Sequence, residues 1–473
     1  AKAANAAQPA QAHDYNEAAT RDLFIDLLLK EAGWALDQPR DREFEVQGMP
    51  NNEGKGFVDY VLWSGERPLA IVEAKRTRRS AKEGEQQARL YADCLEKSTG
   101  HRPVIYGSNG YEHWMWDDST SAPRPVQGFH TRDELELMQQ RRATRKPLAS
   151  LPISARIVER HYQQRAIRRI ADAFERDQQR KALVVMATGA GKTRTVIALV
   201  DLLMRAGWVK RVLFLADRVA LVTQAVNAFK AHLPDAAPVN LVTERSAEGR
   251  VYVSTYPTMM GLINENAGGA QRRFGIGHFD LIVVDEAHRS IYQKYRAIFG
   301  YFDALLVGLT ATPKDEIDRN TYSLFGLESG VPTDAYGLDD AIAEGYLAPP
   351  KAISVPLKFQ REGIRYDALS DDEKEQWDAL DWDDEGGEAP DAVSAEAVNQ
   401  WLFNQDTVDK MLALLMERGH KVAGGDRLGK TIIFARNQQH AEFILQRFDA
   451  NYPEYRGAFA RTITFRTEYA QSL

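Results

Sequence analysis

The stretch Leu183-Val184-Val185-Met186-Ala187-Thr188-Gly189-Ala190-Gly191-Lys192-Thr193 decides the fold. It joins an apolar strand to a glycine-bearing loop and then to the start of an amphipathic helix. The two glycines let backbone N–H groups turn inward around an anion, and the helix N-terminus adds the positive end of its dipole. The stretch therefore predicts a phosphate-binding loop at the edge of a parallel sheet.

The residues of this loop predict an ATP site. Lys192 is expected to reach the β- and γ-phosphates, and Thr193 to ligate Mg²⁺. Met186 stands where the general pattern has its first glycine, so the strict pattern is not met. The expected ATP-binding residues of the loop are Thr188, Gly189, Ala190, Gly191, Lys192 and Thr193.

Short apolar runs alternate with helical stretches on both sides of this loop. Such alternation predicts an α/β domain in which crossover helices join parallel strands. The expected helices include 192–206 and 219–231, and the expected strands are 182–187, 212–216, 251–254, 280–284 and 305–309.

An acidic pair follows the fourth of these strands, in the run Asp285-Glu286-Ala287-His288. A carboxylate at such a strand end suits Mg²⁺, so Asp285 is expected to hold the ion together with Thr193. Glu286 is the expected catalytic residue that orients and deprotonates the attacking water. A solvated acidic turn is the alternative for an isolated pair.

Further motifs lie at the ends of the other strands. They are Leu215-Ala216-Asp217-Arg218 with Gln224, Val253-Ser254-Thr255-Tyr256 and Gly308-Leu309-Thr310-Ala311-Thr312-Pro313. They resemble, in order and spacing, the motifs of superfamily 2 helicases and translocases, although Thr310 and Thr312 taken alone could be helix caps. The resemblance implies that His288, Thr310 and Thr312 couple hydrolysis to domain motion, and that Arg218, Gln224, Ser254 and Thr255 lie near the nucleic-acid backbone.

Residues 160–167 resemble the adenine-reading element of the same superfamily. Gln163 is the expected contact, because an amide can pair with both N6–H and N7 of adenine. A polar helix face is the alternative. Further along, residues 430–435 resemble the first strand of a second motor domain. The element that supplies arginine fingers from that domain is not found before Leu473, so we expect the chain to bind ATP better than it hydrolyses it.

Two apolar runs near the N-terminus, 57–63 and 69–75, flank a five-residue loop and predict a hairpin. If the hairpin is symmetric about Glu66, Trp63 faces Leu69 and Asp59 faces Glu73. Lys75 then shares the side of Glu73, because alternate residues point to the same face.

Two opposed carboxylates, about 5 Å apart, would weaken an ordinary sheet by repulsion. A divalent metal removes the conflict, so Asp59 and Glu73 are expected to ligate Mg²⁺ for attack of water on a phosphodiester. Lys75 would stabilise the developing negative charge. The alternative is an amphipathic hairpin with solvent-facing charges.

The flanking helices add to this pattern. Residues 16–21, the Asp59…Glu73-Ala74-Lys75 motif and residues 87–91 together resemble restriction-like nucleases of the PD-(D/E)xK type. The resemblance implies accessory roles for Gln87 and Tyr91, one helical turn apart, and for Glu17 as a further metal ligand, although Glu17 could equally be a surface residue. The basic stretch 76–82 suits phosphate contacts.

Composition limits the other possibilities. The 473 residues are 44% hydrophobic and 27% charged, which is typical of globular protein with about three domains. The single Cys94 excludes an internal disulfide and a cysteine-rich zinc site. No run is long and apolar enough for a membrane span or a signal peptide, so we expect a cytoplasmic protein.

Charge is distributed unevenly along the chain. Residues 371–391 hold eleven acidic residues and one Lys, a local charge of −10, so the rest of the chain carries +3 of the total of −7. We expect the segment 366–398 to be a disordered acidic insertion rather than a screen over a DNA channel. The expected domains are a nuclease domain at 1–146 that ends in a charged linker, a first RecA-like ATPase domain at 147–345 and a partial second one at 346–473.

A restriction-like nuclease domain followed by a superfamily 2 motor resembles the restriction (R) subunit of type I restriction–modification enzymes. The resemblance implies ATP- and Mg²⁺-dependent translocation on double-stranded DNA, cleavage of unmodified DNA, and assembly with methyltransferase (M) and specificity (S) subunits. Two alternatives remain open at this point. One is a superfamily 2 helicase or remodelling ATPase with a structural N-terminal domain, and the other is a nuclease-dead, ATP-sensing DNA-binding scaffold.

Overall fold

The computed structural model describes most of the chain, and contacts divide it into two compact units, 1–349 and 350–473. The described residues are 20–75, 84–268, 271–287, 291–312, 314–317, 319–352, 364–368, 374, 392–393, 405–455 and 457–464. In this part of the chain no helix has the length and apolar character that a membrane crossing requires.

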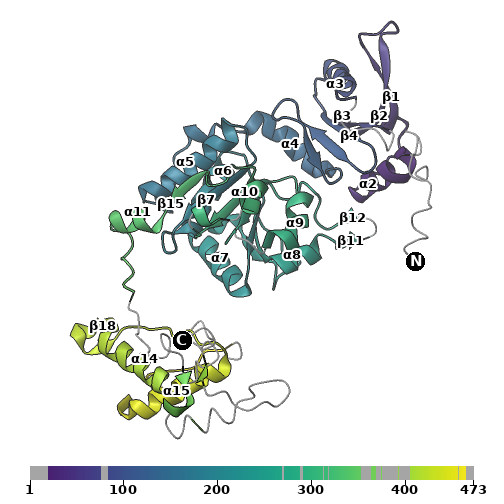
Figure 1. Cartoon of the computed structure of the whole chain (residues 1–473). Coiled ribbons are helices and arrows are strands. Elements are labelled where there is room, and N and C mark those ends of the chain that lie inside the picture. Colours follow the sequence, from purple (N-terminus) through teal and green to yellow (C-terminus); the bar gives the residue numbers. More distant parts are fainter. Residues whose placement is uncertain are drawn as a thin grey trace, which may run out of the picture. The chain divides into compact units, whose positions relative to one another are not determined.

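The first unit holds two sheets, each with its own helices (Figure 1). The first sheet has six strands in the order β1 to β6, and all neighbours are antiparallel except β3 and β4. Its strands are β1 Arg42–Gln47, β2 Lys55–Ser64, β3 Arg67–Ala74, β4 Val104–Ser108, β5 His113–Trp116 and β6 Arg124–Val126.

Helices cover both faces of this sheet. Helix α3 (Glu85–Thr99), which makes the crossover between β3 and β4, packs through Ala88, Tyr91 and Leu95 on the face that contains Val61 and Ile71. The other face packs against the N-terminal helix, formed by a π-helical turn Arg21–Ile25 and α2 (Asp26–Glu31), and against α4 (Arg132–Thr144).

The charged stretch that was expected to be a linker therefore contains an ordered helix. Thr131 caps α4 by accepting from the Glu134 N–H, and the Glu134 side chain accepts from the Thr131 N–H. Gln139 donates to the Pro68 and Leu69 carbonyls of β3. The charges in this segment lie on a helix that packs on the sheet, which the charge content alone did not indicate.

The second sheet has seven strands, every neighbouring pair is parallel, and the order is β15-β7-β14-β13-β8-β10-β9. This confirms the predicted α/β class and the five predicted strands. The strands are β7 Lys181–Met186, β8 Val212–Ala216, β9 Pro238–Asn240, β10 Val251–Thr255, β13 Leu281–Val284, β14 Leu305–Thr310 and β15 Asp334–Tyr336.

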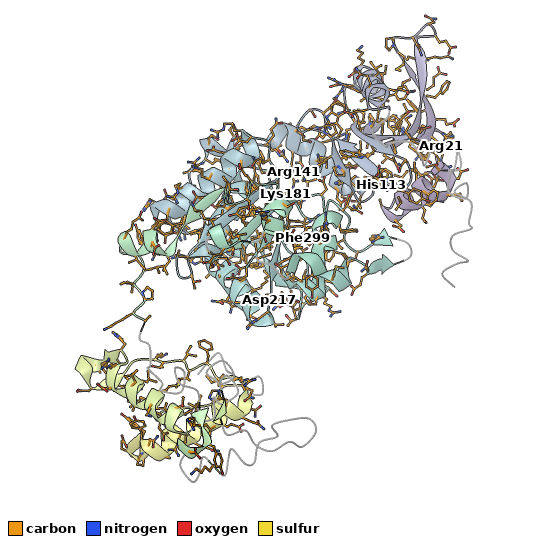
Figure 2. All side chains as sticks on the ribbon, viewed as in Figure 1. Arg21, His113, Arg141, Lys181, Asp217 and Phe299 are labelled. Atoms are coloured by element: carbon orange, nitrogen blue, oxygen red, sulfur yellow. The ribbon has the colours of Figure 1, made fainter. Side chains whose placement is uncertain are left out.

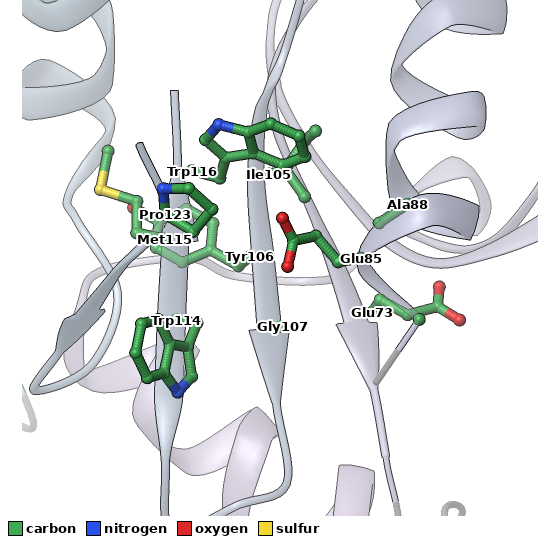
Figure 3. Close-up of a pocket in the computed structure, with 11 residues that line it drawn as sticks. Glu73, Glu85, Ala88, Ile105, Tyr106, Gly107, Trp114, Met115, Trp116 and Pro123 are labelled. Carbon is green, nitrogen blue, oxygen red and sulfur yellow. The ribbon is translucent and has the colours of Figure 1, made fainter. Parts of the chain in front are cut away.

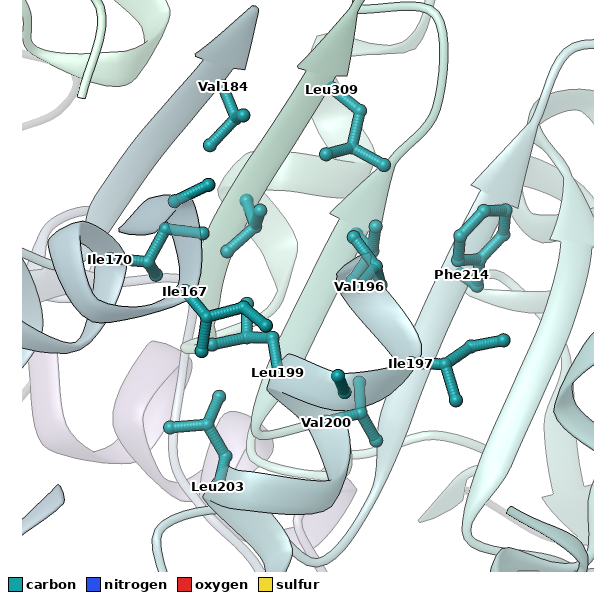
Figure 4. Packing of buried hydrophobic residues seen from close by; sticks show 14 of the residues in the cluster. Ile167, Ile170, Val184, Val196, Ile197, Leu199, Val200, Leu203, Phe214 and Leu309 are labelled. Atoms are coloured by element: carbon teal, nitrogen blue, oxygen red, sulfur yellow. The ribbon is translucent and has the colours of Figure 1, made fainter. Parts of the chain in front are cut away.

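Both faces of the parallel sheet are covered, which explains why its strands are apolar throughout. Figure 4 shows Ile167 and Ile170 of α5 and the apolar side of α6 packed against Val184, Leu309 and Phe214 of the strands. The helices on this face are α5 His161–Glu175, α6 Lys192–Arg205 and α7 Val219–His232, and those on the other face are α8 Tyr256–Leu262, α9 Ile291–Tyr301 and α10 Arg319–Phe325.

Shorter elements complete the first unit. Helix α11 (Leu338–Ala343) follows β15, and a small hairpin pairs β11 (Asn266–Gly268) with β12 (Gln271–Arg272). The remaining turns are 3-10 helices at Pro39–Asp41, Leu148–Ser150, Pro234–Ala236 and Lys314–Glu316.

The second unit contains helices α14 (Gln405–Arg418) and α15 (Gln438–Asn451), which pack through Val408, Leu412 and Phe448. Its short pieces are β16 Ile364–Arg365, 3-10 turn Tyr366–Ala368, β17 Ala392–Val393, β18 Lys421–Val422, 3-10 turn Ala423–Gly425, β19 Arg427–Leu428 and 3-10 turn Pro453–Tyr455. Most of the acidic segment 366–398 lies outside the described residues, so its predicted disorder stays a prediction.

The predicted strand 430–435 is wrong. These residues form no strand, and Ile432 and Phe434 are 78% and 90% exposed. A buried parallel strand requires neighbouring strands on which to form its hydrogen bonds, and β18 and β19 pair only with each other. Residues 430–435 are apolar, but the described residues of 350–473 contain no sheet in which they could form a strand.

The hairpin between β2 and β3 is tighter than expected. Tyr60, Val61 and Leu62 pair with Val72, Ile71 and Ala70, as the symmetric register predicts. The register then shifts, so Trp63 pairs with Pro68 and not with Leu69. The connection is a two-residue turn at 65–66 rather than a five-residue loop, and Gly65 supplies the left-handed conformation (φ 57°) that such a turn requires.

Candidate functional site

The phosphate loop and the motifs that follow the other strands gather at one edge of the seven-stranded sheet. Residues 187–191 follow β7, Thr310 ends β14, and Asp285 follows β13. Because β14 lies between β7 and β13 and all three are parallel, these segments meet at the carboxyl edge. Ligands of open α/β sheets bind at this edge.

The phosphate loop is a cradle of backbone. Gly189 and Gly191 have φ of 88° and 91°, a region that favours glycine, and α6 begins directly at Lys192. A Cβ on Gly191 would lie 2.5 Å from Gln163 Nε2, so a side chain there would require the Gln163 amide to move. Ala190 is fully buried, Thr188 is exposed and Thr193 is partly exposed at the start of α6. This cradle fits a nucleotide phosphate.

The acidic pair faces the loop lysine. Lys192 Nζ lies 3.6 Å from Glu286 Oε1, and Glu286 has φ of 53°, a conformation that is unusual for a residue with a side chain. The Asp285 carboxylate accepts from the Glu286 N–H, and the Ala287 N–H donates to the Leu309 carbonyl of β14. Strained backbone of this kind is common at functional sites. His288 lies outside the described residues.

Gln163 lies directly against the phosphate loop. Its side chain is 4% exposed, and Nε2 donates to the Ala190 carbonyl over 3.1 Å. The neighbouring Tyr162 hydroxyl donates to the same carbonyl. In this structure the amide therefore supports the loop, and adenine recognition by Gln163 stays a prediction.

Thr310 and Thr312, two of the residues expected to couple hydrolysis to motion, lie at the carboxyl end of β14. Thr310 is fully buried at the end of β14, and its hydroxyl accepts from the Thr312 N–H over 3.1 Å. The two threonines therefore fix the turn that leaves β14, next to the phosphate loop. Their coupling role stays a prediction.

The four residues expected near DNA fall into two groups. Arg218 has an 80% exposed side chain, and Gln224 on α7 is exposed as well. Ser254 and Thr255 are buried, and the Thr255 hydroxyl caps α8 by accepting from the Thr258 N–H. A contact between this strand end and DNA would therefore come from the backbone rather than from the Ser254 side chain.

A second charged site lies in the six-stranded sheet. The ladder between β2 and β3 ends at Tyr60 and Val72, and beyond it Asp59 Oδ2 accepts from the Ala74 N–H over 2.8 Å. This side-chain contact replaces the expected backbone pairing of Asp59 with Glu73. Lys75 Nζ lies 2.8 Å from Glu73 Oε1, and Glu73 is 6% exposed. The structure thus brings Asp59, Glu73 and Lys75 to one end of the hairpin.

Arg21, on the N-terminal helix, also reaches this site. Its Nη1 lies 2.9 Å from Asp59 Oδ1 and 3.0 Å from Glu43 Oε1. Burial alone would lower the pKa of Arg21, but the two carboxylates outweigh it and raise the pKa. Arg21 ends the stretch 16–21 that resembles restriction-like nucleases, but no role was predicted for it, because the contact of a helix with a strand does not follow from sequence spacing.

The accessory residues lie beside the acidic site. Gln87 Nε2 donates to the Tyr91 hydroxyl over 2.6 Å, as their spacing of one helical turn allows. Burial raises the pKa of Tyr91, with Glu73 and Asp59 adding to the effect. Glu17 and the basic stretch 76–82 lie outside the described residues.

The donor set of this site suits Mg²⁺, but it has only two carboxylates. Asp59 and Glu73 offer carboxylate oxygens, the ligands that Mg²⁺ prefers, and a Mg²⁺ site usually keeps several waters. No group of three or more acidic, histidine or cysteine side chains with metal-binding geometry exists in the described part of the chain. Two protein ligands and water are compatible with Mg²⁺ and not with a closed zinc site.

Contacts at the phosphate loop also come from residues that the sequence analysis missed. A Cβ on Gly189 would lie 3.1 Å from Leu347 Cδ2, so the segment after α11 packs over the loop. His161 Nε2 lies 2.7 Å from Glu344 Oε2, and the Tyr336 ring stacks on Tyr162 with centroids 3.8 Å apart. These partners are roughly 160 to 180 residues apart in sequence and share no motif, so no local signal could find them.

Buried ion pairs connect the two sheets of the first unit. Asp303, just before β14, pairs with Arg124 of β6 over 2.7 Å and with Arg180 over 2.8 Å. Burial opposes the charge of Asp303, yet Arg124 and Arg180 hold its pKa well below the usual value. Arg141 of α4, labelled in Figure 2, pairs with Asp280 over 2.5 Å.

Two family models match the chain. The model described as the second domain of the type I restriction enzyme EcoKI endonuclease subunit matches residues 37–136, which include the acidic site. The model described as the res subunit of type III restriction enzymes matches residues 156–315, which include the phosphate loop and the acidic pair.

Known proteins match over longer stretches. The EcoAI endonuclease subunit of Escherichia coli is 29% identical over 79% of this chain and 45% of its own length, and the EcoKI endonuclease subunit of strain K12 is 25% identical over 91% and 43%. A solved fragment described as an HsdR subunit from Vibrio vulnificus YJ016 covers 94% of this chain and 76% of its own, at 24% identity and a TM-score of 0.42.

The chain thus spans less than half the length of the two curated relatives. The two family models between them include both charged sites, and each model describes part of a restriction enzyme. The chain is similar in sequence to the endonuclease subunits of type I restriction enzymes.

Proposed function

We propose that this chain is the ATP-driven, DNA-translocating and DNA-cleaving subunit of a type I restriction enzyme. The observation that carries the proposal is the presence of two separate charged sites in one chain. One is a phosphate cradle that faces an acidic pair, and the other is a pair of carboxylates with an adjacent lysine.

In the proposed motor site, the loop backbone and Lys192 hold the phosphates of ATP. Thr193 and Asp285 would hold Mg²⁺, and Glu286 would orient and deprotonate the attacking water. The 3.6 Å contact between Lys192 and Glu286 supports this assignment, because it puts the water-orienting carboxylate within reach of the phosphate-binding lysine. Arg218 and Gln224 are exposed and suit contacts with the DNA backbone.

In the proposed nuclease site, Asp59 and Glu73 would hold Mg²⁺ and Lys75 would stand beside the scissile phosphate. Bound Mg²⁺ supplies charge neutralisation for attack of water on the phosphodiester. The Ala74 N–H fixes one oxygen of Asp59, and Lys75 fixes one oxygen of Glu73, so both carboxylates are held in place before DNA arrives. Gln87 and Tyr91 would lie beside the same carboxylates.

The domain assignment belongs to the same proposal. The six-stranded sheet with α4 would form the nuclease domain, and the seven-stranded sheet the first motor domain. The second unit would be part of the second motor domain. Recognition of the DNA sequence would come from methyltransferase and specificity subunits, and the substrate would be unmodified double-stranded DNA.

The test is cutting and translocation by two variants in a complex reconstituted with methyltransferase and specificity subunits. We expect Asp59→Ala to abolish cutting of unmodified circular DNA and to leave ATP-driven translocation intact. Lys192→Ala is expected to abolish both activities, because cutting by this class of enzyme depends on translocation.

The other outcomes identify the alternatives. If cutting survives Asp59→Ala, the N-terminal sheet is structural and the chain is a helicase or remodelling ATPase. If the unaltered complex binds ATP and DNA but neither cuts nor translocates, the chain is an ATP-sensing scaffold.

A further inference from the structure

A short segment that precedes a strand of the seven-stranded sheet is buried in the core of the other sheet. Residues 275–280 lead into β13, and Ile276 among them is 4% exposed. Ile276 belongs to the buried cluster that joins the six-stranded sheet to α2 and α4. We call residues 275–280 the joint segment, because they are part of the connection between the two sheets.

Two glycines allow the close approach of the joint segment to α4. A Cβ on Gly275 would lie 2.3 Å from Glu134 Oε1, and a Cβ on Gly277 would lie 2.3 Å from His130 Cδ2. Glu134 lies in the first turn of α4, and His130 comes just before that helix. The start of α4 therefore packs against the backbone on either side of Ile276.

The end of the joint segment is fixed by a charged contact. The Arg141 guanidinium of α4 donates two hydrogen bonds to the Asp280 carboxylate, over 2.5 and 2.7 Å. The same carboxylate accepts from the backbone N–H groups of Lys210 and Arg211, which precede β8. Loss of one partner from such a largely buried pair leaves the other charge uncompensated, so the contact holds α4 firmly to the start of β13.

His130 connects the joint segment with the strand of the acidic site. The Tyr106 hydroxyl of β4 lies 2.7 Å from His130 Nδ1, and Tyr106 pairs in register with Val72 of β3. Figure 3 shows Tyr106 on β4 and Glu73 near the end of the neighbouring β3. Because Val72 directly precedes Glu73, the part of the sheet that His130 contacts also holds Glu73 in place.

The same contacts lie at the start of two strands that end at the ATP site. The joint segment continues into β13, whose four residues are buried and are followed by Asp285 and Glu286. Asp303, whose Oδ2 lies 3.4 Å from His130 Nε2, precedes β14, and β14 ends at Thr310. The distance from Asp280 to Asp285 along β13 is only about 16 Å, at a rise of about 3.3 Å per residue.

We propose that the joint segment couples the two charged sites. The state of the ATP site acts through β13 and β14 on the start of α4, and so sets the position of β3 and Glu73 for cutting. A close-packed interior transmits small displacements because it has no space to absorb them. Ile276, His130 and Arg141 are positioning residues in this proposal, since none of them belongs to either charged site. The inference rests on the proposed motor and nuclease functions.

Hydrogen exchange tests the coupling without any DNA cutting. Amide exchange in the chain is compared with and without Mg²⁺ and a non-hydrolysable ATP analogue. We expect the analogue to change exchange rates in α6, which begins at the phosphate loop, and to change those in α4 by about threefold. Ile276→Ala should abolish the change in α4 and keep the change in α6.

Cutting by the reconstituted complex gives the functional test. Ile276→Ala should lower the cutting rate about tenfold, because small misplacements of a reacting group are costly, and should leave translocation and Mn²⁺ binding unchanged. Leu69→Ala is the matched control. It removes a side chain of the same size from the same buried cluster, but from β3 itself and not from the joint segment. This control should lose similar stability and keep its cutting rate.

A second variant covers a folding defect in Ile276→Ala. Arg141→Gln keeps a hydrogen-bond donor for Asp280 and removes the charge. It is also expected to slow cutting by the complex, with translocation unchanged, and Arg141→Lys should recover part of the rate because it restores the charge.

The proposal is overturned if the ATP analogue leaves exchange in α4 unchanged, or if Arg141→Gln cuts at the rate of the unaltered complex. It is also overturned if Ile276→Ala and Leu69→Ala slow cutting equally, since the cluster would then only support the fold. Failure of the nuclease assignment gives a different result. In that case Asp59→Ala leaves cutting intact, while the nucleotide-dependent exchange in α4 remains.

Discussion

The two charged sites of this chain differ in the groups that form them: backbone groups form one, and side chains form the other. The phosphate loop consists of backbone, with Gly189 and Gly191 in left-handed conformations and the first turn of α6. The acidic site consists of side chains from β2, β3 and the N-terminal helix, which strand pairing brings together. A site made of backbone groups uses consecutive residues and can be recognised in the sequence. A site made of side chains depends on how segments that are distant in sequence pair with one another.

The largest effect is expected where the backbone itself is changed. In Gly191→Ala, an alanine at φ 91° is strained by about 1–2 kcal/mol, and its Cβ would lie 2.5 Å from Gln163 Nε2. We expect ATP affinity to fall roughly a hundredfold, measured by binding of a fluorescent ATP analogue.

A double variant separates the two causes. Gly191→Ala with Gln163→Ala removes the clash and keeps the strain, so it should recover part of the affinity. Unchanged binding by Gly191→Ala alone would show that the loop does not hold phosphate through its backbone.

Acid is expected to weaken the six-stranded sheet through His113. Burial lowers the pKa of this histidine to about 4, and its Nδ1 lies 2.8 Å from Ser108 Oγ. Above pH 6.5 the ring is neutral in both the folded and the unfolded chain. As the pH falls from 6.5 to 4, only the unfolded chain takes up the proton, so stability is lost across this window.

The part of the loss that His113 contributes between pH 7 and pH 5 is about 2 kcal/mol in the free energy of unfolding, measured by urea titration at each pH. His113→Asn keeps a polar partner for Ser108 and should remove this part of the pH dependence. Equal pH dependence in His113→Asn and the unaltered chain would assign the acid sensitivity to another group, such as His278, whose pKa burial lowers to about 3.

Gly84→Ala is the counterpart of Gly191→Ala in the acidic site. Gly84 has φ of 93°, and a Cβ there would lie 2.5 Å from Lys75 Cε. The substitution should push the ammonium group of Lys75 away from Glu73. We expect the rate of DNA cutting to fall about tenfold, and the rate of ATP hydrolysis to stay unchanged.

Gly65→Ala is the matched control for strain. Gly65 also has a positive φ, 57°, but no atom lies within 4 Å of the added Cβ. This variant should lose some stability and keep its cutting rate. A tenfold slower rate in Gly65→Ala as well would mean that hairpin strain, and not displacement of Lys75, controls the site.

The smallest effect is expected for Arg21→Gln. Arg21 holds Asp59 Oδ1 at 2.9 Å and so competes with a metal ion for that oxygen. Removal of the positive charge should lower the Mg²⁺ concentration for half-maximal cutting by about two- to fivefold. A higher Mg²⁺ requirement would show that Arg21 supports the metal site by orienting Asp59.

The same contrast explains what could be predicted from sequence. Strands such as Leu281–Val284 are buried on both faces and read as continuous apolar runs, so the inner strands of the parallel sheet were found. The edge strands β9 and β15 have three residues each and contain Pro238 and Asp334, so they carry no such signal.

The acidic site was predicted in part, because its residues depend on register. The pairing of Val61 with Ile71 follows from symmetry about the turn, but the shift at Trp63 depends on how a two-residue turn twists the strands. Contacts between elements that are distant in sequence, such as Arg21 with Asp59 and Leu347 over Gly189, could not be predicted.

Direct binding of a divalent ion tests the central claim, that Asp59 and Glu73 form a metal site separate from the motor site. Mn²⁺ binding to the nucleotide-free chain is measured by electron paramagnetic resonance for the unaltered chain, Asp59→Asn, Glu73→Gln and the motor-site control Thr193→Ala. We predict that a bound Mn²⁺ ion is lost in each of the two carboxylate variants and kept in Thr193→Ala. Unchanged Mn²⁺ binding in Asp59→Asn and Glu73→Gln would contradict the account.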